Sequence, residues 1–314
     1  MKRALIIGSR GQDGRLLWDQ LTAMTGYEVR GLVRSAADPA VNEIGCDLLN
    51  ASEVRSVLSD LKPDEIYYLA AFHHSSESVR PPQSELFSRS FAVNVHGLLG
   101  VLEAVMAVSP ASRILYAGSS HVFGENAPAP QDEQTPLAPT NIYGISKTAG
   151  IQACRHFRDH SGVFVSVAIL YNHESPFRRP EFVSRKIVKG AMDIKRGKTD
   201  RLFIANLRAE VDWGYAPDSV DAMWRILQLE KPGDFVVATG ERHSVKEFVE
   251  IIFEMAGLDW RRYVKEESTL APTRAGTLTG DSSKLRKLTG WAPTVTFREM
   301  VTALWNAALQ EETR

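Results

Sequence analysis

The sequence predicts an α/β protein with a doubly wound parallel sheet and a smaller α/β domain toward its C-terminal end. Three observations predict this fold. A short apolar strand, residues 3–7, opens the chain and runs into a glycine-rich turn and a helix. Apolar strands without polar alternation, typical of sheets buried on both faces, then alternate with helical patterns to about residue 170. Beyond this point the alternation becomes irregular. We expect residues 1–170, joined by some later segments, to form the first domain, and 171–314 to form most of the second.

The opening turn predicts a dinucleotide site. Gly8, Gly11 and Gly14 follow the first strand in a G-x-x-G-x-x-G pattern, and a helix with regularly spaced leucines comes next. Glycines let the backbone approach a pyrophosphate, and the N-terminus of a helix favours its negative charge. The pattern is typical of a Rossmann-type fold that binds a nicotinamide dinucleotide. The alternative is a plain strand, turn and helix.

The second strand, residues 27–33, bears on the choice of cofactor. An acidic residue at its end would bind the ribose hydroxyls of NAD, but the strand ends at Arg34. An arginine can pair with a 2′-phosphate, so NADP is favoured over NAD, unless Arg34 is only a surface residue. Asp47 follows a short segment and could lie at the adenine. Ala70 and Ala71 end the next strand, and their small side chains would let a cofactor pass closely.

The remaining elements follow from local periodicity. In the first domain we expect helices over 54–61, 94–108 and 142–160, and strands over 113–117 and 163–170. The proline-rich segment 127–139 is expected to be a loop over the site. In the second domain we expect helices over 183–195, 220–230 and 245–256, and short strands near Leu202 and Phe235.

A tyrosine and a lysine carry the clearest catalytic signal. Tyr143 and Lys147 are one helical turn apart and share a helix face, and Ser119 and Ser120 lie at the end of the strand 113–117. With a nicotinamide nearby, the lysine charge would lower the pKa of the phenol. The phenol could then pass a proton to or from an alcohol while hydride moves. Tyr-x-x-x-Lys is weak alone, but together with the glycine turn it predicts a redox site.

Composition agrees with a soluble globular enzyme. The chain has 314 residues, 44% of them hydrophobic, and a net charge of −1, so nucleic acid is not an expected partner. No apolar run is expected to reach membrane-spanning length, and the first strand leaves no room for a signal peptide. Cys46 and Cys154 are too few for a disulfide framework and lack metal-ligand spacing, so no metal is predicted. The cytoplasm is the expected location.

Several motifs resemble one family. The chain is similar to the extended short-chain dehydrogenase/reductases (the NAD-dependent epimerase/dehydratase family) that act on nucleotide sugars, and within them to the GDP-mannose 4,6-dehydratases. The matching segments are Gly11-Gln12-Asp13-Gly14, Pro63-Asp64-Glu65-Ile66-Tyr67, Asn172-His173-Glu174-Ser175-Pro176, Arg185-Lys186-Ile187, Asp212-Trp213-Gly214 and Ala238-Thr239-Gly240-Glu241.

The resemblance implies roles for individual residues. Tyr143 would be the catalytic base, Lys147 its partner, and Ser119 the hydroxyl that holds the sugar O4. The substrate, a GDP-linked sugar, would also meet Ser78, Ser120, Asn172 and, near the nucleobase, Lys186. The family also implies a homodimer or homotetramer assembled through the helices 94–108 and 142–160. Contacts to NADP would come from Tyr143 and Lys147 and from Gly8, Gly11, Gln12, Asp13, Gly14, Arg34, Asp47, Leu48, Leu69, Ala70, Ala71, Leu170, His173 and Arg178.

The sequence departs from the family at positions that bear on the reaction and on the substrate. The glutamate that serves the family in dehydration is His121, and two family arginines are replaced by Val211 and Ala271. Arginine binds diphosphate in bidentate fashion. Arg208 and Arg274 lie close by in sequence and are candidates to replace the lost charge.

His121 leaves the reaction open. It could replace the glutamate as acid and base, mark a chain that kept only redox chemistry, or hydrogen-bond the sugar. Glu77, His73 and His74 are further candidates for the same pocket, although a solvated loop glutamate and pocket lining are the simpler interpretations. A 4,6-dehydratase is therefore the first hypothesis. A reductase of a GDP-4-keto-6-deoxy sugar is the second, an epimerase the third, and an inactive nucleotide-binding regulator a remote fourth.

Overall fold

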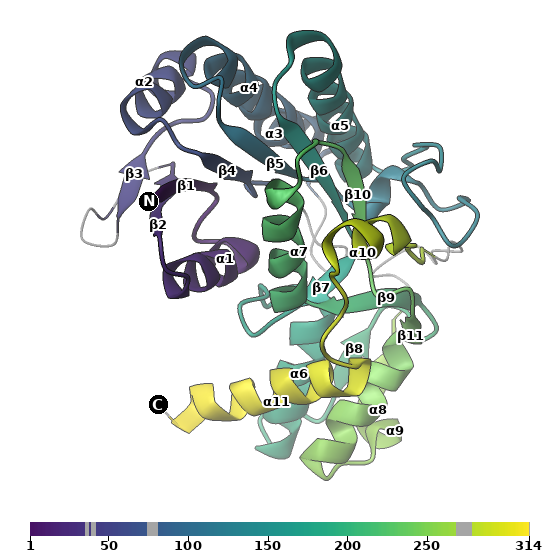
Figure 1. Ribbon diagram of the computed structural model, residues 1–314. Coiled ribbons are helices and arrows are strands. Elements are labelled where there is room, and N and C mark those ends of the chain that lie inside the picture. Colours follow the sequence, from purple (N-terminus) through teal and green to yellow (C-terminus); the bar gives the residue numbers. More distant parts are fainter. Residues whose placement is uncertain (35–37, 39–41, 74–80, 268–277, 314) are drawn as a thin grey trace.

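The computed structural model describes residues 1–34, 38, 42–73, 81–267 and 278–313. It confirms the predicted doubly wound parallel sheet (Figure 1). The described strands of this sheet lie in the order β10-β6-β5-β4-β1-β2-β3, and every neighbouring pair is parallel. Their bounds are β1 (Lys2–Ile7), β2 (Tyr27–Val33), β3 (Glu43–Gly45), β4 (Glu65–Tyr68), β5 (Arg113–Ala117), β6 (Val165–Leu170) and β10 (Asp234–Val237).

Helices cover both faces of the sheet, so a strand such as β1 buries apolar residues on both of its sides. On β1, Leu5 and Ile7 join a core with helices from one face, and Ala4 and Ile6 join a core with helices from the other. The first face is covered by α2 (Ala51–Leu61), α4 (Gly97–Val108) and α5 (Ile142–Ser161). The second is covered by α1 (Gln12–Ala23), α7 (Ala216–Gln228) and α10 (Ser283–Thr289).

Later parts of the chain return to this sheet. β10, the strand expected near Phe235, pairs with β6 in parallel at the edge of the main sheet. α7 packs on α1, β5 and β6, and α10 packs on β10 and α7. The sheet is therefore completed by a strand that begins more than sixty residues after the end of β6.

A second core lies below the sheet in Figure 1. It is formed by α6 (Val183–Lys195), α8 (Val245–Ala256) and α11 (Phe297–Thr313) around Trp213, whose ring stacks on Phe297 at 5.6 Å. Two small sheets flank it. One contains β7 (Asn172–Glu174), β9 (Glu210–Tyr215) and β11 (Arg242–Ser244), and the other contains β8 (Leu202–Ile204) and β12 (Val264–Glu266), next to α9 (Trp260–Tyr263).

One helical run differs from the expectation. α3 (Gln83–Phe91), a π-turn η2 (Ala92–His96) and α4 continue without a break, so the run Gln83–Val108 is long and apolar enough to span a membrane, contrary to the sequence prediction. In the fold, 44% of its most apolar window is buried. Leu98 and Val105 are fully buried, and α4 packs on α2 and α5, as a core helix does.

The order of the strands reverses between β1 and β4, and the glycine turn lies at this point. In doubly wound sheets, ligands bind outside the carboxyl ends of the strands where the order reverses. Gly8 follows β1 there with φ of +94°, and a Cβ on it would lie 2.8 Å from the backbone nitrogen of Ala70, just after β4. Only glycine permits both this backbone angle and this close approach.

Candidate active site

Ser119, Tyr143 and Lys147 come together at the carboxyl end of β5. Ser119 follows β5 in extended backbone, and Tyr143 and Lys147 lie in the first two turns of α5. The side chain of Ser119 lies close enough to the phenol of Tyr143 to help lower its pKa. Nζ of Lys147 lies 5.7 Å from the centre of the Tyr143 ring. The sequence spacing thus correctly grouped the three residues, although their roles stay predictions.

Burial changes the pKa values of both ionisable groups in this cluster. Burial raises the pKa of Tyr143 to about 12, although the charge of Arg178 and the side chain of Ser119 act to lower it. Burial also lowers the pKa of Lys147 to about 7. Its Nζ donates to the carbonyl oxygen of Ala117 at 2.7 Å and lies over the ring of Tyr116. Burial is therefore the largest influence on the pKa of both groups.

Asn94 is a further polar residue of the site that the sequence interpretation missed. It is fully buried in the π-turn η2, where such turns are frequent at functional sites. Its side chain donates to Ser146 Oγ at 2.9 Å and accepts from the backbone N–H of Phe72 at 3.2 Å. Its carbonyl oxygen accepts from the Tyr116 hydroxyl. Asn94 therefore ties the loop after β4 to α5. The available signal was an asparagine inside an otherwise apolar helix.

His121 lies beside the tyrosine. It belongs to the short 3-10 helix η3 (Ser120–Val122), in which Ser120 is buried. Its backbone N–H donates to Ser119 Oγ at 3.3 Å. Its ring centre lies 5.8 Å from that of Tyr143, and its Nδ1 lies 3.0 Å from Nδ2 of Asn141. The position matches the expected pocket, and the ring contact with Asn141 is new.

The stacked rings of His73 and Phe182 lie next to Tyr143. His73, after β4, lies edge-on to Tyr143 at 4.4 Å between ring centres and stacks on Phe182 at 5.3 Å. The guanidinium of Arg178 lies 3.9 Å from the centre of the Phe182 ring. The side chain of Arg179 donates a hydrogen bond to the carbonyl oxygen of His73. His73 therefore lies against Tyr143, and its place in a substrate pocket stays a prediction. The other candidates of this loop, His74, Glu77 and Ser78, lie outside the described residues.

The glycine turn forms a cradle that fits a dinucleotide. A Cβ on Gly14 would lie 2.3 Å from the carbonyl oxygen of Gly8, so the turn folds tightly back on itself. Gly11 is exposed, and the helix α1 begins at Gln12. Leu69 and Ala70 border the turn, and the exposed Ala71 follows them. Leu170 ends β6 in the same sheet.

Gln12 and Asp13 connect this turn to the second domain. The Gln12 amide donates to the carbonyl oxygen of His173 at 3.1 Å and accepts from Ser175. Both carboxylate oxygens of Asp13 lie 3.1 Å from Nε2 of His173. Burial alone would raise the pKa of Asp13, but the charge and hydrogen bond of His173 lower it to about 2. Arg178, which pairs with Glu174, adds positive charge nearby.

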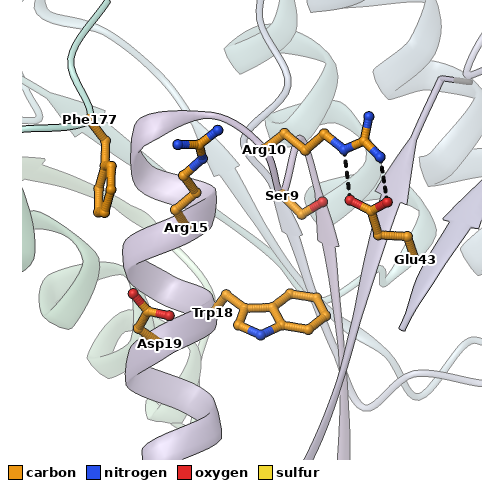
Figure 2. A pocket seen from close by; sticks show the side chains of 7 residues that line it. All are labelled: Ser9, Arg10, Arg15, Trp18, Asp19, Glu43 and Phe177. Carbon is orange, nitrogen blue, oxygen red and sulfur yellow. Dashed lines mark hydrogen bonds and ion pairs between the residues drawn. The ribbon is translucent and has the colours of Figure 1, made fainter. Parts of the chain in front are cut away.

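The residues that we expect at the adenosine end of the cofactor lie on separate loops after β2 and β3. Arg34 is exposed just after β2. The Asp47 carboxylate accepts from the backbone N–H of Leu49, which shapes the loop, and Leu48 packs against the first core. The sequence interpretation missed Arg10, inside the glycine turn. Its guanidinium forms a two-point ion pair with Glu43 of β3 at 2.8 and 2.5 Å (Figure 2).

A pocket of about 340 Å³ lies beside this ion pair. Figure 2 shows its lining on the turn, the first helix and β3, with Phe177 reaching in from the second domain. The lining residues are Ser9, Arg10, Arg15, Trp18, Asp19, Glu43 and Phe177. Ser119, Tyr143 and Lys147 do not line it, so this pocket is separate from the residues expected to do the chemistry.

The predicted substrate residues are only partly brought together. Asn172 begins β7, one residue before His173, and Lys186 lies in the first turns of α6, after Phe182. Arg208 is exposed on the turn after β8, where its backbone N–H donates to the side chain of Asn206. Val211 lies in β9. Arg274 and Ala271 lie outside the described residues, as do any contacts they make.

Asp212, next to Val211, has a structural task. Its carboxylate is buried and accepts hydrogen bonds from the backbone N–H groups of Thr239, Gly240 and Gly280. The Asp-Trp-Gly and Ala-Thr-Gly-Glu motifs thus meet each other. Within the described residues, no cluster of histidine, cysteine and acidic side chains could hold a metal ion.

Comparisons with known proteins agree with this geometry. A family model described as GDP-mannose 4,6 dehydratase matches residues 5–304. GDP-mannose 4,6 dehydratase 2 of Arabidopsis thaliana is 39% identical over 96% of this chain and 85% of that protein. The GDP-mannose 4,6-dehydratase of Vibrio cholerae is 32% identical over 95% of this chain and 91% of that protein.

Solved structures share the fold. The structure of RMD from Pseudomonas aeruginosa complexed with NADPH has a TM-score of 0.82 and 23% identity, and it covers all of both chains. UDP-glucose 4-epimerase of Thermotoga maritima has a TM-score of 0.85 and 20% identity over 99% of this chain and 100% of that one. The whole-chain match to the family model and the identity to its curated members show that the chain belongs to the GDP-mannose 4,6-dehydratase family.

Proposed function

We propose that the protein is an NADP-dependent nucleotide-sugar 4,6-dehydratase acting on a GDP-linked, mannose-type sugar. The observation that carries the proposal is that Ser119, Tyr143 and Lys147 come together at the end of β5 and the start of α5, in a chain that matches the GDP-mannose 4,6-dehydratase family over nearly its whole length. The relatives named for this reaction are 31–39% identical to it.

The residues present suit a nicotinamide cofactor. Gly8 and Gly14 leave a cradle that a Cβ would fill, at the N-terminus of α1. NADP is favoured over NAD because Arg34 directly follows β2 and Arg10 lies within the turn, so two guanidinium groups are available to a 2′-phosphate. A nicotinamide held at this cradle would supply reversible hydride transfer for the oxidation at sugar carbon 4 and the reduction at carbon 6.

The side chains then have separate tasks. Ser119 orients the oxygen at carbon 4 by a hydrogen bond, and the Tyr143 hydroxyl takes the proton from that oxygen. The phenol must first lose its own proton, which its raised pKa opposes. Positive charge brought close to the ring would reverse this; Arg178 already acts in this direction, and Lys147, whose Nζ lies 5.7 Å from the ring centre, can add to it.

Elimination of water also requires a base that removes the proton at carbon 5. A ketone at carbon 4 acidifies the hydrogen at carbon 5, which a base removes as the hydroxyl at carbon 6 leaves as water. His121 stands where the family has its glutamate. A second candidate function, reduction of a GDP-4-keto-6-deoxy sugar, needs no such base. The Asn141–His121 contact favours this alternative, because it occupies one nitrogen of the ring that would have to act.

The test is incubation of the protein with GDP-mannose and catalytic NADP, followed by mass spectrometry of the nucleotide sugar. Loss of one water without net NADPH formation supports the dehydratase. Tyr143→Phe should abolish the change, whereas Tyr263→Phe, in the second core, should not. If the sugar is unchanged and the protein oxidises NADPH with a GDP-4-keto-6-deoxy sugar, the ketoreductase takes its place.

A further inference from the structure

His121 and Asn141 meet through one ring nitrogen. Nδ1 of His121 lies 3.0 Å from Nδ2 of Asn141. The other end of the same amide is also engaged, because Oδ1 accepts the backbone N–H of Gly144 at 2.8 Å and so caps α5. Turning the amide over would set its NH2 group against the Gly144 N–H, donor against donor. The helix cap therefore determines which end of Asn141 faces His121.

This orientation determines where His121 carries its hydrogen. An amide NH2 group can only donate, so Nδ1 of His121 must accept and carries no hydrogen. A neutral imidazole then has its hydrogen on Nε2. Protonation of the ring would place a second N–H on Nδ1, pointing at the NH2 group of Asn141, and would break the contact. Asn141 thus disfavours the charged ring.

We propose that Asn141 is a positioning residue that holds His121 as a neutral hydrogen-bond donor, so that Nε2–H of His121 binds an oxygen of the sugar. The inference rests on the proposed function, since it assigns the way in which one residue of that site meets the substrate. A sugar hydroxyl or a keto oxygen is the complementary acceptor. Of the roles that the sequence left open for His121, this state excludes acid and base catalysis and is compatible with hydrogen bonding to the sugar.

The consequence concerns the proton at carbon 5. The resemblance implies that the family's glutamate accepts this proton and then gives it to the leaving hydroxyl. His121 in the inferred state cannot accept it at Nε2, which already carries hydrogen, or at Nδ1, which Asn141 occupies. A dehydratase with this site takes the proton with another group, and a ketoreductase does not need to take it.

The protonation state can be measured directly on the protein without substrate. Long-range proton–nitrogen NMR of ¹⁵N-histidine-labelled protein distinguishes a bare ring nitrogen from a protonated one. The chain has eight histidines, and loss of one set of signals in His121→Gln assigns His121. We expect a bare Nδ1 and a protonated Nε2 at neutral pH. A hydrogen on Nδ1, alone or on both nitrogens, overturns the proposal.

Asn141→Asp tests the control by the amide. Aspartate keeps an oxygen for the Gly144 N–H and also caps helices well, so α5 should stay intact. It also sets an acceptor against Nδ1, so the hydrogen should move to Nδ1 and the midpoint of the His121 titration should rise by about one pH unit or more. Asn50→Asp, the same change at the N-cap of α2, should leave the His121 signals unchanged. Unchanged signals in Asn141→Asp overturn the proposal.

Turnover variants test the donor role. His121→Gln keeps a side-chain N–H donor without a basic nitrogen, and His121→Phe keeps only the bulk. We expect His121→Gln to retain about tenfold more kcat/KM than His121→Phe. Equal losses overturn the donor role. Because the NMR experiment needs no turnover, a protein that dehydrates no sugar refutes the proposed function and leaves the assignment of His121 intact.

Discussion

Nε2 of His173 lies 3.1 Å from both carboxylate oxygens of Asp13, and its other ring nitrogen, Nδ1, lies 2.7 Å from the carbonyl oxygen of Tyr171. Both neighbours can only accept, so the ring carries a hydrogen on each nitrogen and is positively charged. His121, whose Nδ1 faces an amide donor, is in the opposite situation. The site thus contains two histidines whose charge states are set by their partners.

The Asp13–His173 pair should stabilise the fold over a limited pH range. The pKa of Asp13 is lowered from 3.8 to about 2, so its contribution is present above pH 3.8 and is lost as the pH falls toward 2. Burial opposes the charge of His173, but Asp13 raises its pKa above 6.5. The contribution of His173 is therefore complete below pH 6.5 and is lost as the pH rises through the raised value.

Asp13→Asn should lower the free energy of unfolding by about 2 kcal/mol between these limits. Urea unfolding of the wild type and the variant across pH measures the difference, which should shrink at both ends of the range. Asp19→Asn, an exposed position on the same helix, is the control. A deficit that does not vary with pH would contradict the ion pair.

Lys147 should make stability rise with pH. Burial lowers its pKa from 10.5 to about 7, so between these values the unfolded chain binds more protons than the folded one. The free energy of unfolding should therefore increase with pH in this range, by about 1.4 kcal/mol per unit at most. Subtracting the curve of Lys147→Met from that of the wild type isolates this contribution. A flat difference would show that Lys147 keeps its ordinary pKa.

The fold was predictable where local pattern and burial agree. A strand such as β1 buries both faces, so it lacks polar alternation, and the glycine turn follows it at once. The continuous run Gln83–Val108 was not predicted, because the π-turn η2 shifts the apolar periodicity in its middle. The place of β10 in the main sheet was not visible locally either, because it depends on pairing with β6.

The site, like the fold, contains some residues that local spacing predicts and others that depend on contacts between distant segments. Tyr143 and Lys147 are four residues apart on one helix, so spacing alone places them together. Asn94 acts through Ser146, and Arg10 acts through Glu43, and these contacts join segments that are distant in sequence. The raised pKa of Tyr143 was not predicted, because it depends on burial in the folded chain.

Gly8 should be required both for its backbone angle and for the close approach of the turn to Ala70. Gly8 and Gly26 have nearly the same φ, +94° and +93°, but a Cβ would meet the backbone of Ala70 at Gly8 and nothing within 4 Å at Gly26. Gly26→Ala should therefore cost about 1–3 kcal/mol from backbone strain alone. Gly8→Ala should cost more and also abolish NADPH binding, measured by fluorescence titration. Equal costs and equal binding would show that the turn is not a cofactor cradle.

Glu43 should set how strongly the protein prefers NADP over NAD. It holds the Arg10 guanidinium at two points, so a 2′-phosphate has to compete with its carboxylate for that arginine. Glu43→Gln should tighten NADPH binding by about fivefold, the size of a partly exposed ion pair, and leave NADH binding unchanged. Glu28→Gln removes the same charge from an ion pair with Arg30 on β2 and should change neither affinity. Equal tightening of NADPH and NADH would mean that Glu43 repels the cofactor as a whole, and no change in either would place the 2′-phosphate away from Arg10.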